Sequence, residues 1–153
     1  MGGSGVELVA IKPAERDDFM RVAEQHFRGL SSAFTPHDDW KGSYFENILA
    51  NPQFFLRWIF SEGERSGFIL YGLEPHRFLP RGTGVIFELY VDPEKRRRGI
   101  ARLAAQIAIR ELQLRGPSKI QLEVVEGNDE AVALWRSLGF EKVTARYVLA
   151  AKL

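Results

Sequence analysis

Four consecutive cationic residues, Lys95 to Arg98, stand directly before Gly99 in this 153-residue chain. The apolar run Val85 to Val91 precedes them and predicts a strand, which ends at Asp92-Pro93 because proline has no N–H to donate to a neighbouring strand. An amphipathic pattern follows and predicts a helix. A turn at a helix start leaves backbone N–H groups unpaired, and the helix dipole adds partial positive charge there. These residues therefore predict a site for a phosphate-bearing ligand.

The basic turn differs from two common phosphate-binding loops. Neither of their patterns, G-x-x-x-x-G-K-[ST] and G-x-G-x-x-G, occurs here. A run of four basic residues is also typical of a solvated surface, so the turn alone does not decide between a ligand site and an ordinary solvated turn. The apolar face predicted for the following helix consists of Leu103, Ala104, Ile107, Ala108 and Leu114.

The composition disfavours several classes of protein. Twenty-one basic and 20 acidic residues give a net charge of +1, which predicts no general attraction to nucleic acid or to a membrane surface. Without cysteine there is no disulfide, thiol nucleophile or cysteine-based zinc site, and His26, His37 and His76 lack ligand spacing, so no metal is predicted. No apolar run reaches the ~18 residues of a membrane span, and the start lacks a signal-peptide pattern. We expect a cytoplasmic protein.

Hydrophobic periodicity and turn residues predict a mixed α/β fold with the order β-α-α-β-β-β-α-β-α-β-β, a single domain whose mostly antiparallel sheet is flanked by helices. Strands are expected at 6–11, 54–61, 67–73, 85–91, 120–125, 140–143 and 146–151, and helices at 17–28, 38–50, 99–115 and 130–138. The hairpin turn is placed at 62–66, with Gly63 and Gly67 as turn residues. The strand at 120–125 follows a helical crossover and should be parallel to its neighbour. Residues 1–5 are interpreted as a cloning remnant or flexible leader, and 6–153 as the domain.

Three pieces between Gly84 and Phe140 together resemble the GNAT superfamily of N-acetyltransferases. Arg96-x-x-Gly99-x-Ala101 is similar to the family's pyrophosphate loop, R/Q-x-x-G-x-G/A. The strand at 120–125 follows at the proper distance, and Asn128-x-x-Ala131-x-x-Leu134-Trp135-x-x-x-Gly139-Phe140 is similar to N-x-x-A-x-x-L-Y-x-x-x-G-F. Each piece alone is common, whereas the three in this order are specific. The resemblance covers a little over a third of the chain.

The resemblance implies acetyl-CoA as co-substrate, bound where the fourth and fifth strands separate. It implies that the backbone of Leu89, Tyr90 and Val91 pairs with the pantetheine as a neighbouring strand would. It assigns the pyrophosphate to Arg96, Arg97, Arg98, Gly99, Ile100 and Ala101. Gly99 allows close approach because it has no Cβ. Asn128 either caps its helix or reaches the cofactor, and both are compatible; Ala131 leaves room beside the cofactor, and Trp135 lies next to it.

Acetyl transfer to an amine requires the neutral amine. An alkyl amine of pKa ~10.4 is neutral only about once in a few thousand molecules at pH 7, so a general base or a desolvating pocket is needed. Glu88 is our candidate base, because a carboxylate inside an apolar strand is costly unless it faces water, a partner or a substrate. The alternative is a strand residue that faces solvent or pairs with an arginine such as Arg57.

The leaving thiolate presents a second question. Trp135 stands where the family often has a tyrosine that protonates this group, and an indole supplies no proton at neutral pH. Tyr147 is our candidate acid, with Tyr90 as a second choice; each can equally be a packed strand residue. Water is a further candidate, because a thiolate of pKa ~8.5 is a tolerable leaving group.

The sequence does not name the acceptor. We expect direct transfer to a primary amine of a small molecule, peptide or protein. The first two helices and next strand are rich in rings, which are core residues or in part a homodimer surface: Phe34, Trp40, Tyr44, Phe45, Phe54, Phe55, Trp58 and Phe60. Asp38, Asp39 and Glu46 either attract a cationic amine or complement a helix dipole. The alternatives are a non-catalytic acyl-CoA-binding module and, less favoured by the net charge, a nucleic-acid-binding domain.

Overall fold

The computed structural model describes residues 5–30, 38–78, 80–149 and 151, so most of the predicted leader lies outside the described residues. They form a single mixed α/β domain around a five-stranded sheet of order β1-β2-β3-β4-β5. The strands are β1 (Val6–Ala10), β2 (Phe54–Ser61), β3 (Glu64–Glu74), β4 (Thr83–Val91) and β5 (Ile120–Leu122). The helices are α1 (Arg16–Leu30), α2 (Asp38–Ala50), α3 (Ile100–Leu114) and α4 (Asp129–Ser137), with short 3-10 turns η1 (Pro13–Glu15) and η2 (Pro93–Lys95).

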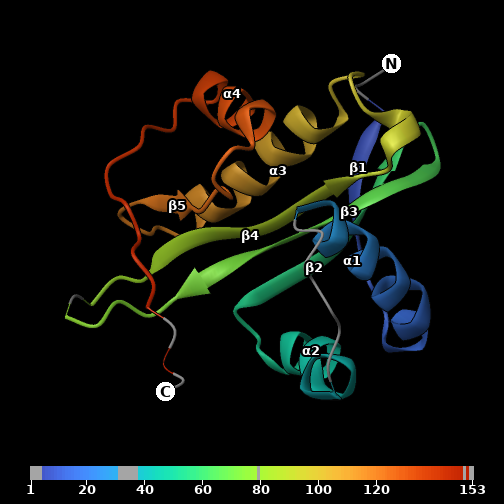
Figure 1. Ribbon diagram of the computed structural model, residues 1–153, viewed down its shortest axis with the longest axis horizontal. Coiled ribbons are helices and arrows are strands. Elements are labelled where there is room, and N and C mark those ends of the chain that lie inside the picture. Colours follow the sequence, from blue (N-terminus) through green and yellow to red (C-terminus); the bar gives the residue numbers. More distant parts are fainter. Residues whose placement is uncertain (1–4, 31–37, 79, 150, 152–153) are drawn as a thin grey trace.

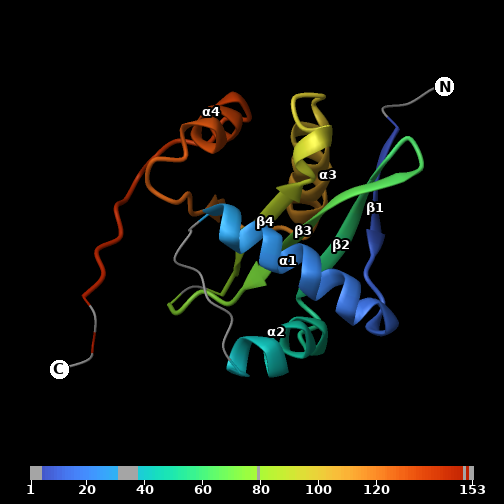
Figure 2. The same ribbon diagram turned by 45° about the vertical axis from the view of Figure 1, so that its right-hand side comes forward.

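The first four strands are antiparallel and β5 is parallel to β4, as the helical crossover predicts. Helices α3 and α4 cover one face of the sheet, and α1 and α2 cover the other (Figures 1 and 2). Each face therefore has its own buried core. The core under α1 and α2 consists of Ile11, Phe19, Ala23, Phe45, Ile48, Leu56, Trp58, Phe68, Leu70 and Tyr90.

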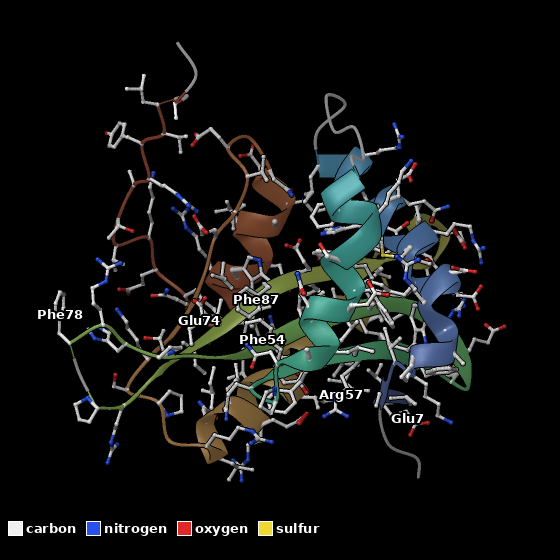
Figure 3. The ribbon with its side chains drawn as sticks, turned by 90° about the horizontal axis from the view of Figure 1, so that it is seen from below. Glu7, Phe54, Arg57, Glu74, Phe78 and Phe87 are labelled. Atoms are coloured by element: carbon white, nitrogen blue, oxygen red, sulfur yellow. The ribbon has the colours of Figure 1, made fainter. Side chains whose placement is uncertain are left out.

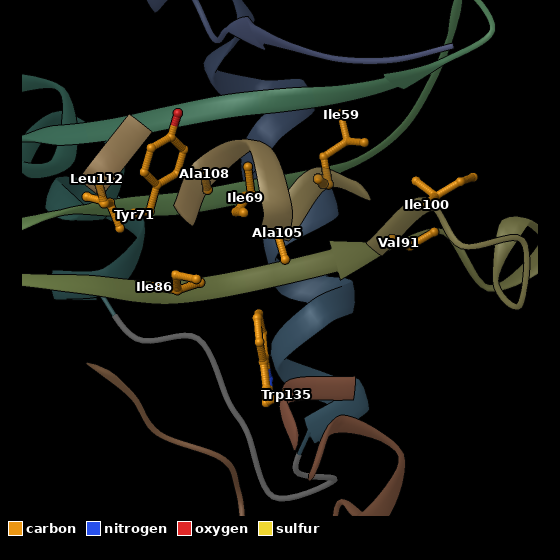
Figure 4. Close-up of a cluster of buried hydrophobic side chains, with 11 residues drawn as sticks. Ile59, Ile69, Tyr71, Ile86, Val91, Ile100, Ala105, Ala108, Leu112 and Trp135 are labelled. Atoms are coloured by element: carbon orange, nitrogen blue, oxygen red, sulfur yellow. The ribbon is translucent and has the colours of Figure 1, made fainter. Parts of the chain in front are cut away.

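The core under α3 explains how that helix lies against the sheet. Ala104, Ala105 and Ala108 are fully buried, and their small side chains let the helix backbone approach Ile69 and Ile86 closely (Figure 4). The predicted apolar face is wrong at one end, since Leu114 is 74% exposed. At 3.6 residues per turn, Leu114 points away from the stripe that the buried alanines define.

The hairpin between β2 and β3 is tighter than predicted. Glu62 (φ 51°) and Gly63 (φ 82°) both have left-handed backbone conformations, which a two-residue hairpin turn of type I′ requires. Gly67 is not a turn residue: it is buried within β3, where an added Cβ would lie 1.9 Å from the Tyr90 carbonyl oxygen. Because it has no side chain, Gly67 allows β3 and β4 to approach closely at this point.

Strand β4 contains a β-bulge beside Glu88. Leu70 pairs with Glu88 and the next residue, Tyr71, pairs with Ile86, so Phe87 is an extra residue in the ladder. Ile86 packs in the core under α3, whereas Phe87 packs against the core under α1 and α2. An unbroken strand alternates its faces, and a bulge shifts that alternation by one residue. Glu88 consequently faces α1 as well.

The fold class is confirmed, but the two strands predicted at 140–143 and 146–151 are wrong for the described residues. Residues 140–149 form no strand, and Figure 2 shows this segment running away from the sheet. Val143 is 84% exposed and Val148 is 83% exposed. Residues of high β-propensity form a strand only where a neighbouring strand accepts their hydrogen bonds, and this segment meets none. Strand β5 is likewise shorter than predicted, since only Ile120–Leu122 pairs with β4.

Candidate active site

The second half of β4 has an open edge on the side of β5, the last strand of the sheet. Strand β4 pairs with β5 only through Gly84, Val85 and Ile86, yet β4 continues to Val91. Leu89, Tyr90 and Val91 therefore lie beyond the last β5 partner. The edge of a strand without a neighbour presents N–H and C=O groups to an extended ligand. The separation of the fourth and fifth strands that the sequence implies is thus present in the structure.

The turn after β4 ends at the start of α3. Arg97 (φ 65°) and Gly99 (φ 79°) have left-handed conformations, and the first helical hydrogen bond is donated by Leu103 N to Gly99 O at 3.1 Å. The N–H groups of Ile100 and Ala101, ahead of that bond, have no partner inside the helix. An added Cβ at Gly99 would meet nothing within 4 Å. The turn therefore combines helix-start N–H groups with open space for an anion.

The four cationic side chains of this turn differ in their contacts. Lys95 Nζ donates to the Arg65 carbonyl at 3.2 Å, and Arg98 donates to the Glu94 carbonyl at 3.2 Å. Arg96 Nε donates to the Val91 carbonyl at 2.7 Å, and its guanidinium lies 5.4 Å from the Tyr90 ring centroid. Arg97 is exposed and makes no hydrogen bond or ion pair with any other described residue. Arg97 is consequently the side chain most available to a ligand.

Glu88 is paired with a histidine from α1. His26 Nε2 lies 2.6 Å from Glu88 Oε1, and the side chains are 8% and 22% exposed respectively. The imidazole packs between rings, with centroid distances of 5.0 Å to Phe27, 5.6 Å to Phe68 and 5.6 Å to Tyr90. The carboxylate at the β4 bulge is thus fixed by a buried side chain on a helix.

The alternative interpretation of Glu88 named an arginine such as Arg57 as a partner, whereas the structure gives it a histidine. Arg57 lies on the face of the sheet that α3 covers, where its guanidinium is 5.6 Å from the Phe55 ring centroid. Burial raises the pKa of Tyr71 on the same face, and the positive charge of Arg57 partly offsets that rise. Sequence analysis missed His26. One signal was available: His26 follows Phe19 and Ala23 at helical spacing, so it belongs to the buried stripe of α1. A histidine there needs a polar partner.

Aromatic side chains surround this pair. Burial and the negative charge of Glu88 raise the pKa of Tyr44, so the Tyr44 hydroxyl stays protonated over the whole physiological range. The rings of Phe27, Trp40 and Tyr44 lie against one another with centroid distances of 5.5 to 6.2 Å. Figure 3 shows Phe54 beside Phe87, with ring centroids 5.0 Å apart. The site can therefore desolvate a small apolar group next to a carboxylate.

The other predicted acceptor-side residues have structural roles where they are described. Phe45 and Trp58 are 2% and 1% exposed, which supports the core interpretation. Glu46 accepts a hydrogen bond from Arg16 Nε at 2.6 Å, and this guanidinium lowers the pKa of Glu46. Phe34 and the side chains of Asp38 and Asp39 lie outside the described residues.

Helix α4 carries the remaining predicted cofactor residues. The Asn128 side chain accepts a hydrogen bond from Ala131 N at 3.2 Å, so the predicted helix cap is present. Trp135 is 8% exposed and reaches from α4 toward β4 (Figure 4), and its ring centroid is 5.6 Å from that of Phe140. Gly139 has φ 99°, a left-handed conformation that is common for a glycine just after the end of a helix.

The structure does not bring Tyr147 into this group. Its side chain is 93% exposed, on the segment that runs away from the sheet. Tyr90 is 6% exposed and contacts the His26 ring, and burial together with the Asp92 charge raises the pKa of Tyr90. Among the residues described, no cluster of three or more His, Asp or Glu side chains could hold a metal ion.

A hollow of about 470 Å³ lies between α1 and α2, and Trp40 is among its lining residues. It is lined by charged residues that already have partners: Arg28 pairs with Glu24, and Arg21 pairs with Asp18. Glu88 is not among its lining residues, so we assign it no role in the site. No helix in the described part of the chain has the length and apolar character needed to cross a membrane.

Known proteins are similar to this chain in sequence and in fold. Residues 15–140 match the acetyltransferase (GNAT) family. The chain is 34% identical over 145 residues to the N-alpha-acetyltransferase RimI of Mycobacterium tuberculosis, covering 92% of this chain and 83% of that protein. It is 43% identical over 61 residues to the [ribosomal protein bS18]-alanine N-acetyltransferase of Salmonella typhimurium. That second match covers 40% of this chain and only 41% of the relative.

Solved structures of low sequence identity agree in fold. The aminoglycoside N-acetyltransferase AAC(6')-Iy in complex with CoA has a TM-score of 0.74 at 19% identity, over 99% of this chain and 97% of that chain. The ribosomal-protein-alanine N-acetyltransferase of Brucella melitensis biovar Abortus 2308 has a TM-score of 0.72 at 16% identity, over 95% and 98%. At such identities the likeness establishes the fold alone. Because the family match extends from α1 to the end of α4, this chain belongs to the acetyltransferase (GNAT) family.

Proposed function

We propose that this protein transfers the acetyl group of acetyl-CoA directly to the α-amino group of a protein or peptide. The observation that carries the proposal is the position of Glu88, a partly exposed carboxylate at the β4 bulge, directly before the open edge of that strand. A carboxylate beside a thioester-binding notch supplies the base that amine acetylation needs.

The open edge of β4 and the turn before α3 bind different parts of the cofactor. The backbone of Leu89, Tyr90 and Val91 pairs with the pantetheine amides. The pyrophosphate lies over Gly99, where N–H groups at the start of α3 and the Arg97 side chain surround it. Asn128, Ala131 and Trp135 of α4 line the other side of the notch. The related fold of AAC(6')-Iy, which was solved with CoA, supports this arrangement.

The chemistry then follows from the amine. Its nitrogen attacks the thioester carbonyl carbon, the C–S bond breaks, and the CoA thiolate leaves. The proton that the nitrogen loses goes to the Glu88 carboxylate, directly or through one water molecule. We assign protonation of the thiolate to water, because Tyr147 is 93% exposed and the Trp135 indole is no acid at neutral pH.

The acceptor class follows from the relatives and from amine basicity. The relatives at 34% and 43% identity are named for N-alpha and alanine acetylation, whereas the aminoglycoside enzymes share only the fold. An α-amino group of pKa ~7.7–8.0 is neutral in about one molecule in ten at pH 7, far more often than a lysine side chain. One carboxylate base is sufficient for such an acceptor.

A thiol-release assay with a panel of amines tests this function. Peptides with a free N-terminal alanine should release CoA faster than N-acetylated peptides that offer only lysine, and faster than aminoglycosides. A preference for lysine or for an aminoglycoside would overturn the acceptor class. Binding of acetyl-CoA without CoA release for any amine would favour the alternative, a non-catalytic acyl-CoA-binding module.

A further inference from the structure

We propose that His26 is a positioning residue for Glu88: its Nε2–H donates to Glu88 Oε1 and holds the second carboxylate oxygen toward the acceptor amine. This inference rests on the proposed function, because it assigns His26 a role only in a reaction that uses Glu88 as base. The juxtaposition that carries it joins α1 to the β4 bulge, two elements that are far apart in the chain.

The contact between the two side chains is short and enclosed. The distance from Nε2 to Oε1 is 2.6 Å, at the short end of the range for a hydrogen bond to a charged group. Because only 8% of the His26 side chain is exposed, the imidazole has little room to rotate. Phe27, Phe68 and Tyr90 contact it through their rings. The orientation of Nε2 is thus set by packing.

Glu88 needs such a partner for a geometric reason. The bulge turns it to the same face as Phe87, and with 22% exposure its flexible side chain reaches the edge of the aromatic site. Without a fixed donor the carboxylate would turn toward water and sample several rotamers. A reacting group misplaced by 1 Å loses much of the benefit of proximity.

The chemical type of the partner also matters. Within the described residues, no arginine or lysine forms an ion pair with Glu88. The titratable groups that face the pair are Tyr44 of α2 and Tyr90 of β4, both of which have hydroxyls with raised pKa values. A permanent cation at Oε1 would favour the ionised carboxylate and weaken it as a proton acceptor. Unlike a guanidinium or an ammonium group, an imidazole carries no permanent charge and still has an N–H to orient the carboxylate.

Three variants of His26 test this role. His26→Phe keeps an aromatic ring and removes the donor, so kcat should fall ~10–100-fold while KM for acetyl-CoA stays within about twofold. His26→Gln carries an amide N–H near the position of Nε2 and should recover most of kcat. If His26→Phe does not fold, His26→Leu takes its place in the comparison with His26→Gln. Loss of kcat that His26→Gln does not recover would contradict a hydrogen-bonding role.

A double-mutant cycle separates this inference from the base assignment. If His26 acts through Glu88, the double variant His26→Phe/Glu88→Gln should have the kcat of Glu88→Gln alone. Additive losses would overturn the positioning role and leave Glu88 as base. Normal turnover in Glu88→Gln alone would instead overturn the base assignment.

A matched control separates the loss of the hydrogen bond from a general loosening of the packing of α1. Phe19→Leu changes a fully buried residue on the same stripe of α1, seven positions before His26 in the chain. It should lower the melting temperature while kcat is retained. A fall in kcat as large as that of His26→Phe would show that loosening α1 suffices to explain the effect, which would overturn the positioning role.

Discussion

Phe87 and Glu88 are consecutive residues of β4, yet both face the helices α1 and α2. The bulge opposite Leu70 and Tyr71 produces this arrangement, because it places one extra residue in β4. Phe87 then contacts Phe54, and Glu88 meets His26. Without the extra residue the two side chains would lie on opposite faces, and Glu88 would not have both an aromatic wall and a buried partner beside the open edge.

Gly99 and Gly63 allow a matched test of the phosphate site. Both have left-handed backbones (φ 79° and 82°), and an added Cβ meets nothing within 4 Å at either position. Alanine should destabilise each protein similarly, by ~1–2 kcal/mol, because of the backbone strain. CoA should raise the melting temperature of Gly63→Ala as it does for wild type, by linkage of binding to stability. Most of that rise should be lost in Gly99→Ala, as thermal shift assays can measure.

An equal CoA-induced shift in both glycine variants would mean that the pyrophosphate lies elsewhere. The comparison is informative because Gly63 sits in the hairpin between β2 and β3, at a turn with no predicted cofactor contact. Any difference between the variants then reports on the ligand and not on the strain that they share.

Arg97 should contribute to cofactor affinity and little to stability. It is exposed and has no hydrogen-bond or ion-pair partner among the described residues, so Arg97→Ala removes no hydrogen bond or ion pair between them. We expect CoA to bind about tenfold more weakly, as loss of one charge-assisted hydrogen bond predicts. Calorimetric titration gives the dissociation constant. The exposed Arg110 on α3 provides the control, and an equal loss in Arg110→Ala would indicate a general charge effect.

Trp135→Phe should retain turnover. The indole packs in the core with 8% exposure, so the smaller ring leaves a partial cavity and should lower the free energy of unfolding by ~1–3 kcal/mol. No proton donor is removed. Denaturant unfolding and steady-state kinetics measure the two effects separately. A collapse of kcat with acetyl-CoA affinity intact would give the indole a role in catalysis or in positioning.

Tyr147→Phe tests the acid predicted from the sequence. A hydroxyl on a side chain that is 93% exposed has no enclosed path to the thioester, so the change should leave kcat within about twofold at neutral pH. A tenfold or greater decrease, with the melting temperature unchanged, would restore Tyr147 as the acid and would require its segment to approach the notch.

Most of the fold could be predicted from local patterns. The bounds of α2 and β2 agree with the predicted ranges because a helix period and a run of strand-forming rings each mark one element. The strands predicted after α4 failed because strand formation depends on a partner that the local sequence does not specify. Val143 and Val148 are strand-forming residues without one.

The candidate site was predictable only in part, and the division has a physical reason. Gly99 has a left-handed backbone and Asn128 caps a helix, and a short motif is sufficient to predict such local features. The partner of Glu88 depends on register, because His26 is 62 residues away in the chain and meets it only through the bulge. A bulge has no reliable local signature, so the sequence identified Glu88 as a candidate base without indicating His26 as its partner.

Glu88→Gln is the decisive test of the base. The amide keeps the size of the side chain but accepts no proton, so turnover near pH 7 should fall by ~10²–10⁴ while acetyl-CoA affinity is retained. The loss should diminish as the pH rises through ~8, because an α-amino acceptor of pKa ~7.7–8.0 then arrives neutral. Profiles of kcat against pH for both proteins measure this rescue.

The matched control for this substitution is Glu123→Gln. Glu123 is 71% exposed and is bound by Arg146 Nη1 at 2.8 and 2.9 Å, so it should not act on the amine. Its turnover should equal that of wild type. If Glu88→Gln is nearly normal at neutral pH and Glu123→Gln is slow, the base lies on the segment after β5. In that case Glu88 would be only a partner of His26 inside the sheet.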